Sequence, residues 1–201
     1  GVLIASPANP TGSVFSKAEL EAIAAIVARH PRVLVLADEI YEYINFMDEG
    51  HFSIGSIEAI KDQVITVNGM AKGFAMTGWR IGYIGAAEWI VKGINKLQGQ
   101  VTSGTNHIAQ RASVVAWDDM TASESMRRAY LVRRELVVDG LKSIPGFKVN
   151  VPDGAFYAFP NISAYFGKSD GTTTIKNSDD FSLYLLEKCH VATVAGSGFG
   201  A

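Results

Sequence analysis

The chain has 201 residues, of which 48% are hydrophobic and 19% are charged, a composition that provides for a sizeable globular core. The net charge of −2 indicates no basic surface for nucleic acid or for an anionic membrane. A single cysteine, Cys189, excludes an intrachain disulfide framework and a cysteine-rich metal site. No apolar run approaches the ~18 residues of a membrane span, so we expect a cytoplasmic protein.

Three short runs rich in valine, isoleucine and leucine predict strands that are buried on both faces of a parallel sheet. They are residues 2–5, 33–37 and 64–67. Between the first two runs, apolar residues at helical spacing predict a helix over residues 17–29, which Ser16 and Glu19 would begin as a capping box. A strand, a helix and a strand in this order predict a βαβ unit.

A further strand is predicted over residues 81–84. Residues 86–117 have a helical pattern that breaks around residues 103–105, and a long charged helix is predicted over residues 123–141. One apolar stripe of that helix contains Met126, Tyr130, Val137 and Leu141.

After about residue 119 the pattern changes to short elements separated by turns. We predict strands over residues 147–151, 156–159 and 191–194, a polar loop over 167–177 and a helix over 179–188. Cys189 follows apolar positions of that helix and is expected to be a small core residue. The chain is therefore predicted to contain a larger α/β domain over residues 1–118 and a smaller α+β domain over residues 119–201.

Four polar features follow the predicted strands of the first domain. They are Asn9-Pro10-Thr11-Gly12, Asp38-Glu39-Ile40-Tyr41, Asn68-Gly69-Met70-Ala71-Lys72 and, eight residues later, Arg80. Open parallel sheets bind ligands outside the carboxyl ends of their strands, so chemistry is expected at this edge.

Each feature also has an ordinary structural interpretation. Asn9 can begin a turn, Asp38 can cap a helix, Lys72 can be a solvated surface charge and Arg80 can pair with any carboxylate. Their order along the chain and their common edge of the sheet make coincidence a poor explanation.

The strings ANPTG, ADEIY, NGMAKGFAMTGWRIGY, DGAFYAFP and VATVAGSGFG resemble the class I/II aminotransferases, which are fold-type I pyridoxal-phosphate enzymes. Within that family the resemblance is strongest to the bacterial aspartate aminotransferase group. It implies a three-layer α/β/α fold with a mostly parallel sheet, present here in part. It also implies amino-group transfer between an amino acid, aspartate above all, and a 2-oxo acid such as 2-oxoglutarate.

The resemblance implies a role for each site residue. Lys72 would form a Schiff base with the aldehyde of pyridoxal 5′-phosphate and, once freed, act as general acid and base. Asp38 would pair with the pyridine nitrogen, and Tyr41 and Asn9 would bind the phenolic oxygen. Arg80 would bind the phosphate. The resemblance further implies a cis peptide bond between Asn9 and Pro10.

The chain departs from the family pattern in places. Ala71 and Gly69 stand where many relatives have a phosphate-binding serine. The glycine-rich phosphate turn and the arginine that holds the substrate carboxylate would lie outside residues 1–201. We interpret the chain as a piece of a longer protein, and we expect it to be inactive by itself. The complete protein is expected to form a homodimer, whose partner site the loop over residues 103–106 would approach.

Two other functions remain open at this point. A C–S or C–C lyase would use the same five residues, and some regulators carry this fold as a non-catalytic pyridoxal-phosphate sensor. A Rossmann dehydrogenase is disfavoured because no predicted strand is followed by G-x-G-x-x-G. Phe156 and Tyr157 are expected to pack the small domain, or else to line the substrate entrance.

Overall fold

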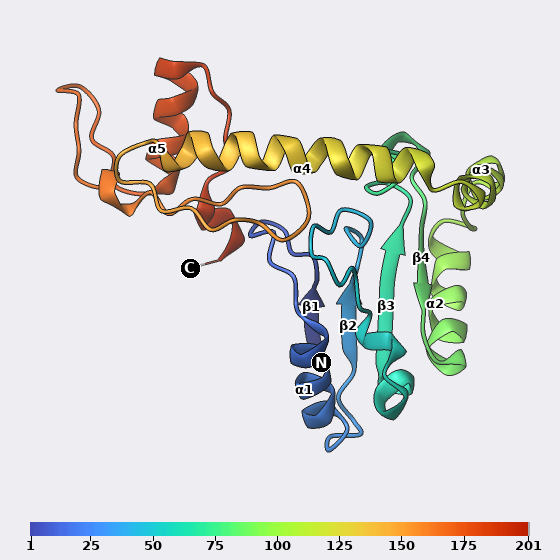
Figure 1. Cartoon of the computed structure of the whole chain (residues 1–201). Coiled ribbons are helices and arrows are strands. Elements are labelled where there is room, and N and C mark those ends of the chain that lie inside the picture. Colours follow the sequence, from blue (N-terminus) through green and yellow to red (C-terminus); the bar gives the residue numbers. More distant parts are fainter. Residues whose placement is uncertain (201) are drawn as a thin grey trace.

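The computed structural model describes residues 1–200, which contain one four-stranded sheet in the order β1-β2-β3-β4 (Figure 1). The strands are β1 (Val2–Ala5), β2 (Val35–Asp38), β3 (Val64–Gly69) and β4 (Gly82–Gly85). The first three are parallel, and β4 runs antiparallel to β3. The expected α/β fold with a mostly parallel sheet is confirmed.

The register brings the carboxyl ends of the first three strands to one edge of the sheet. Ala5 pairs with Asp38, and Asp38 pairs with Val67. The ladder continues one residue further, because Ser6 N donates to Asp38 O at 3.1 Å and Glu39 N donates to Val67 O at 2.9 Å. Residues that follow these strands therefore leave the sheet side by side.

Helix α1 (Lys17–Val27) covers one face of the sheet. Its expected capping box is present, since Ser16 Oγ accepts from Glu19 N and the Glu19 carboxylate accepts from Ser16 N at 2.8 Å. The core between α1 and the sheet consists of Ile4, Leu20, Ala24, Val27, Val35, Ala37, Ile54, Ile60 and Val64. On the opposite face, Leu3 is 69% exposed and Leu36 is 36% exposed.

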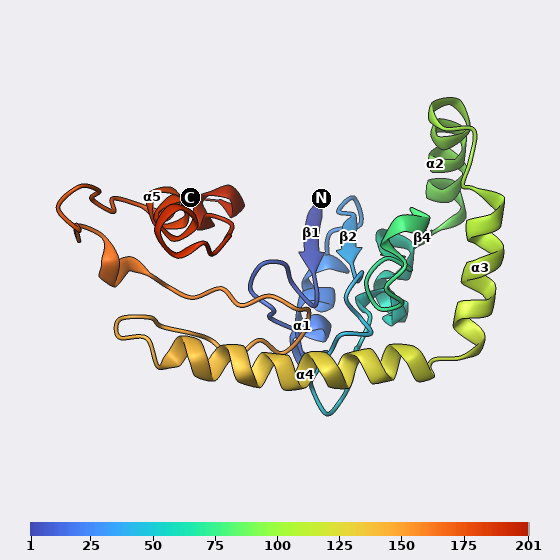
Figure 2. The ribbon, with the colours of Figure 1, turned by 90° about the horizontal axis from the view of Figure 1, so that it is seen from above.

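Three helices follow the sheet: α2 (Glu88–Val101), α3 (His107–Asp118) and α4 (Thr121–Lys142). The expected break between α2 and α3 is present, with Ser103 and Gly104 at positive φ. Helix α4 lies across the carboxyl edge of the sheet, with α3 at one of its ends and the C-terminal region at the other (Figures 1 and 2). Within residues 1–200, no helix is both long enough and apolar enough to cross a membrane.

The C-terminal region is mostly irregular. It contains α5 (Ser178–Tyr184), which continues as a π-helical turn over Leu185–Cys189. Short 3-10 turns complete the chain at Ile54–Ser56, Glu58–Gln63, Thr77–Trp79, Ser163–Tyr165 and Gly196–Phe199. The polar loop over residues 167–177 is confirmed, with a single bridge between Ser169 and Thr174.

Three strands predicted for this region are wrong. Residues 147–151 form only one isolated bridge, from Lys148 to Asn161, and neither residues 156–159 nor residues 191–194 form any. The apolar content of each segment favoured a strand, yet a strand needs a neighbouring chain in register to satisfy its backbone.

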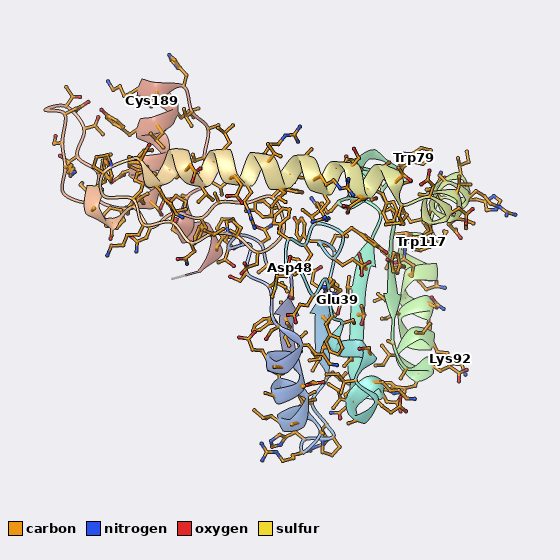
Figure 3. All side chains as sticks on the ribbon, viewed as in Figure 1. Glu39, Asp48, Trp79, Lys92, Trp117 and Cys189 are labelled. Atoms are coloured by element: carbon orange, nitrogen blue, oxygen red, sulfur yellow. The ribbon has the colours of Figure 1, made fainter. Side chains whose placement is uncertain are left out.

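On α4, Val137 of the apolar stripe is 46% exposed, whereas its neighbour Val138 is 2% exposed. One burial prediction is wrong. Cys189 is exposed at the outer end of the last helix (Figure 3). There the π-helical turn changes the angular spacing of side chains, and Leu186 of the same turn is also half exposed.

Candidate active site

The turn after β2 carries the first two candidate residues. Asp38 is half-buried at the strand end, and its Oδ1 accepts from Ile40 N at 3.2 Å. This bond turns the chain directly after the strand, as aspartate commonly does. Tyr41 is 5% exposed and packs with Ile44 and Ala155. Asp38 and Tyr41 are therefore held by strand, turn and core together.

Lys72 lies in the loop that joins β3 to β4. The loop is closed at its base, where Met70 N donates to Ile81 O at 3.3 Å, and Ala75 N donates to Lys72 O at 3.1 Å. Gly73 follows, and a Cβ there would lie 2.7 Å from the Tyr43 side chain. The lysine backbone is thus fixed by close packing that only glycine allows.

Helix α4 holds the Lys72 loop in place through a hydrogen bond. Ser123, which is 4% exposed, donates its hydroxyl to Gly73 O at 2.7 Å. Further along the helix, Arg127 Nη1 donates to Asn45 O at 3.3 Å and Arg134 Nη1 donates to Pro152 O at 3.0 Å. These contacts join α4 to the loops at the carboxyl edge of the sheet.

The Lys72 amine lies among aromatic rings. Its Nζ is 5.7 Å from the centroid of the Tyr41 ring and 5.6 Å from that of Phe156. At these distances a lysine ammonium is attracted by a ring face. Two segments that are far apart along the chain thus lie near the amine, and Tyr41 and Lys72 meet as the sequence indicated.

The surroundings of Tyr41 raise the pKa of its hydroxyl above the ordinary value. Burial contributes most, followed by the hydrogen bond between the hydroxyls of Tyr41 and Tyr157, and the negative charge of Asp38 acts in the same direction. Tyr41 is consequently a neutral hydroxyl that can donate a hydrogen bond at neutral pH.

The turn after β1 contacts the C-terminal region. The Asn9–Pro10 bond is cis, as the resemblance implied. Gly12 has a φ of +70° and its carbonyl accepts from both Asp153 N and Gly154 N at 2.9 Å. Asn9 itself is exposed, and the hydrogen bonds found among residues 1–200 do not join it to Lys72 or Tyr41. Asn9 therefore lies at the same edge of the sheet as Lys72 and Tyr41 but is not hydrogen-bonded to either of them.

Arg80 lies on the same loop as Lys72. Its backbone is left-handed, with a φ of +52°, and Nη1 donates to Thr77 O at 3.0 Å. The side chain is exposed and borders a hollow of about 760 Å³ next to Thr102 and Thr105. The guanidinium can therefore bind an anion that approaches from solvent.

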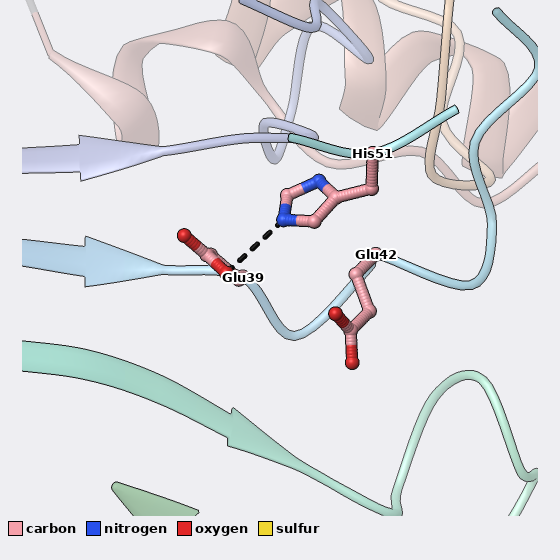
Figure 4. Close-up of side chains that lie close together, drawn as sticks. All are labelled: Glu39, Glu42 and His51. Carbon is pink, nitrogen blue, oxygen red and sulfur yellow. Dashed lines mark hydrogen bonds and ion pairs between the residues drawn. The ribbon is translucent and has the colours of Figure 1, made fainter. Parts of the chain in front are cut away.

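A cluster of ionisable groups lies beside the Asp38–Tyr41 turn (Figure 4). His51 Nε2 is 3.0 Å from one oxygen of Glu39, and Ser53 Oγ donates to the other at 2.7 Å. Glu42 lies within 4.8 Å of both. Three such groups have the chemistry of metal ligands. However, both Glu39 oxygens are already hydrogen-bonded, so the cluster works as an anchor for the turn.

Sequence reasoning missed Ser123, His51 and the bond between Tyr157 and Tyr41. Ser123 and His51 are single polar residues without a motif. Tyr157 was expected to pack the small domain or to line the substrate entrance, with no link to Tyr41. Ala155 has a φ of +58°, which breaks the alternation of an extended chain and brings both Phe156 and Tyr157 against Tyr41. A bulky pair after a glycine-alanine turn was the only available signal.

Known proteins have sequences similar to this chain. The family described as "Aminotransferase class I and II" matches residues 1–201. The chain is 44% identical over 204 residues to the bifunctional aspartate aminotransferase and glutamate/aspartate-prephenate aminotransferase of Petunia hybrida, covering 99% of the chain and 43% of that protein. It is 40% identical to an aspartate aminotransferase of Rhizobium meliloti, covering 99% of the chain and 49% of that protein.

Solved structures of aminotransferases superimpose on this chain. The aspartate aminotransferase of Rhizobium meliloti superimposes with a TM-score of 0.95 at 40% identity, covering all of this chain and 51% of that one. An aromatic aminotransferase of Pyrococcus horikoshii gives a TM-score of 0.87 at 38% identity, covering 99% and 51%. The chain thus spans about half the length of the proteins it matches. It belongs to the class I and II aminotransferase family.

Proposed function

We propose that the protein transfers an amino group between an amino acid and a 2-oxo acid with pyridoxal 5′-phosphate bound at Lys72. One observation carries this proposal. The Lys72 amine lies at the carboxyl edge of the sheet, near the rings of Tyr41 and Phe156, in the loop that follows β3, and β3 pairs with the strand that ends in Asp38. A half-buried lysine amine beside aromatic rings is suited to bind a planar aldehyde.

The residues present fit the cofactor group by group. When bound, pyridoxal phosphate supplies an aldehyde and a pyridine ring that accepts electrons. Lys72 offers the amine for the aldehyde, and Asp38 offers a carboxylate for the pyridine nitrogen. Tyr41 offers a neutral hydroxyl for the phenolic oxygen, because its pKa is raised. Arg80 offers an exposed guanidinium for the phosphate, and Asn9 offers a further amide at the same edge.

Each residue then has a defined task. Lys72 binds the cofactor and moves a proton to and from the substrate α-carbon, a role worth about 10²–10⁴-fold in rate. Asp38 keeps a proton on the ring nitrogen. Its position at the end of β2 holds the carboxylate in place. Tyr41 orients the ring through its hydroxyl.

We further propose aspartate as the amino donor and 2-oxoglutarate as the acceptor. The relatives from Petunia hybrida and Rhizobium meliloti, both named as aspartate aminotransferases, support this choice. The Pyrococcus horikoshii neighbour is an aromatic aminotransferase, so phenylalanine is the natural competitor to test.

The assembly is also a proposal. We propose a cytoplasmic homodimer whose large domain ends at residue 118 and whose small domain begins at residue 119. Exposed apolar side chains on α2 and α3 support a covered surface, since Trp89, Leu97, Val101 and Ile108 are each more than 60% exposed. Light scattering of the complete protein tests this, with a monomer as the contradicting result.

Amino transfer is tested in the complete natural protein that contains this sequence. Aspartate and 2-oxoglutarate are supplied with the cofactor, and oxaloacetate is followed. Lys72→Ala should remove turnover, whereas Lys92→Ala, on the exposed face of α2, should retain it. The 201-residue chain alone should stay far below the ~10 per second of an ordinary enzyme. Normal turnover in Lys72→Ala would refute the proposal.

A further inference from the structure

Tyr41 and Tyr157 form a hydroxyl pair at the centre of the site. The two residues are 116 positions apart, and either oxygen can be the donor in the bond between them. A tyrosine hydroxyl has one proton to donate and two lone pairs that accept. If Tyr41 donates its proton to the cofactor, as the proposed function requires, then only Tyr157 can be the donor within the pair.

Aromatic packing restricts the positions of the Tyr41 and Tyr157 rings. Tyr41 meets Tyr157 edge-on at 5.6 Å and Phe156 edge-on at 5.3 Å. Tyr130 of α4 stacks on Phe156 at 5.3 Å. Edge-to-face and stacked pairs of this kind are favourable beyond their buried area. The positions of both hydroxyls are thus determined by packing on three sides.

Backbone hydrogen bonds join the two segments that carry the hydroxyl pair. Ala155 N donates to Ile44 O at 2.7 Å, and Phe46 N donates to Asp153 O at 2.8 Å. These bonds tie the segment that carries Tyr157 to the segment that directly follows Tyr41. The hydroxyl pair therefore sits between two chain segments that are paired to each other.

We propose that Tyr157 is a positioning residue that donates its hydroxyl proton to Tyr41 and so directs the single proton of Tyr41 toward the phenolic oxygen of the bound cofactor. The inference rests on the proposed function. A donated hydrogen bond also makes Tyr41 a stronger donor in turn, because hydrogen bonds in a chain polarise one another. Tyr157 thereby favours the deprotonated form of the phenolic oxygen.

The test is a pH titration of the bound cofactor's absorbance in the complete natural protein. Tyr157→Phe keeps the ring and removes the donor, so the midpoint should rise by about 0.5 pH units. Tyr41→Phe should raise it further. In the Tyr41→Phe background, Tyr157→Phe should add nothing. Tyr165→Phe is the matched control, because that hydroxyl donates to Pro145 O away from the site, and it should leave the midpoint unchanged.

Three results would overturn the inference: no shift in Tyr157→Phe, an equal shift in both backgrounds, or a shift of the same size in the control. If Tyr157→Phe does not fold, Tyr157→Gln retains a donor and should keep the parental midpoint, and a raised midpoint there counts against the inference. Borohydride reduction of each variant locates the cofactor separately. Absence of an adduct on Lys72 in the parent would refute the proposed function and this inference with it, whereas an adduct with no midpoint shift would refute only the role of Tyr157.

Discussion

The sheet region and the C-terminal region use their apolar residues differently. Nine buried residues from the first 64 positions form one continuous core around α1 and the sheet. In residues 143–200, by contrast, Leu186 is 50% exposed, Val191 is 49% exposed and Val194 is 76% exposed. Asp38 and Lys72 therefore follow strands that belong to a well-packed core. The C-terminal region contributes to the site through a few specific contacts.

The largest effect should come from the scaffold's own carboxylate. Asp38→Ala should leave the cofactor bound to Lys72 and reduce turnover by orders of magnitude, because the ring then loses the charge that keeps its nitrogen protonated. Steady-state kinetics and cofactor absorbance measure the two properties separately. Asp62→Ala, at an exposed position before β3, should behave as the parent. Near-normal turnover in Asp38→Ala would remove the pyridine-nitrogen role.

The unequal packing of the two regions predicts unequal stability effects. Leu20→Ala, at 2% exposure in α1, should lower the free energy of unfolding by about 2–5 kcal/mol through lost burial and a new cavity. Val194→Ala, at 76% exposure, should change it by less than about 0.5 kcal/mol. Urea unfolding of both variants measures the difference. Equal losses would show that the two regions are packed alike.

A buried hydroxyl on α4 holds the Lys72 loop of the sheet region, so its removal should have an intermediate effect. Ser123→Ala leaves the Gly73 carbonyl without its donor, which should cost about 1–3 kcal/mol in the free energy of unfolding. Loss of this bond should also weaken cofactor binding, since Gly73 follows Lys72. Ser125→Ala, exposed on the same helix, serves as the control. If the two serine variants unfold and bind cofactor alike, α4 does not secure the lysine loop.

The smallest effect concerns Glu42 in the anchor cluster. Burial raises the pKa of this carboxyl, while the charge of His51 opposes the change. The folded state therefore binds more protons than the unfolded state above the unfolded pKa, and the free energy of unfolding falls as pH rises through the window between the two pKa values.

The variant Glu42→Gln cannot titrate. Relative to the parent, it should be more stable near pH 7 than near pH 4, where the parent's Glu42 gains its proton. Urea unfolding at both pH values measures the difference, and Glu49→Gln, exposed on the following turn, is the control. A stability difference that does not change with pH would contradict the raised pKa.

The sequence was sufficient for the sheet region. Strands β1 to β3 and helix α1 were predicted within three residues because continuous apolar runs, helical spacing and the Ser16–Glu19 capping box all act locally. The strand order alone then placed Asp38 and Lys72 at the ends of neighbouring strands. The antiparallel strand β4 was found one residue from its place.

The C-terminal region could not be predicted to the same extent. Its extended segments lack partners in register, so the same apolar pattern that formed strands near the N-terminus formed irregular chain here. The contact between Tyr157 and Tyr41 depends on the positive φ of Ala155 and on the pairing of Ile44 with that residue. Neither feature has a signature that a single sequence reveals.

The central claim is that Lys72 carries the cofactor at the junction of the two regions. In the complete natural protein, borohydride reduction should fix pyridoxal phosphate to the lysine it occupies, and peptide mapping by mass spectrometry should identify that residue. We predict a single adduct on Lys72. An adduct on the exposed Lys17, Lys61 or Lys92, with Lys72 unmodified, would contradict it.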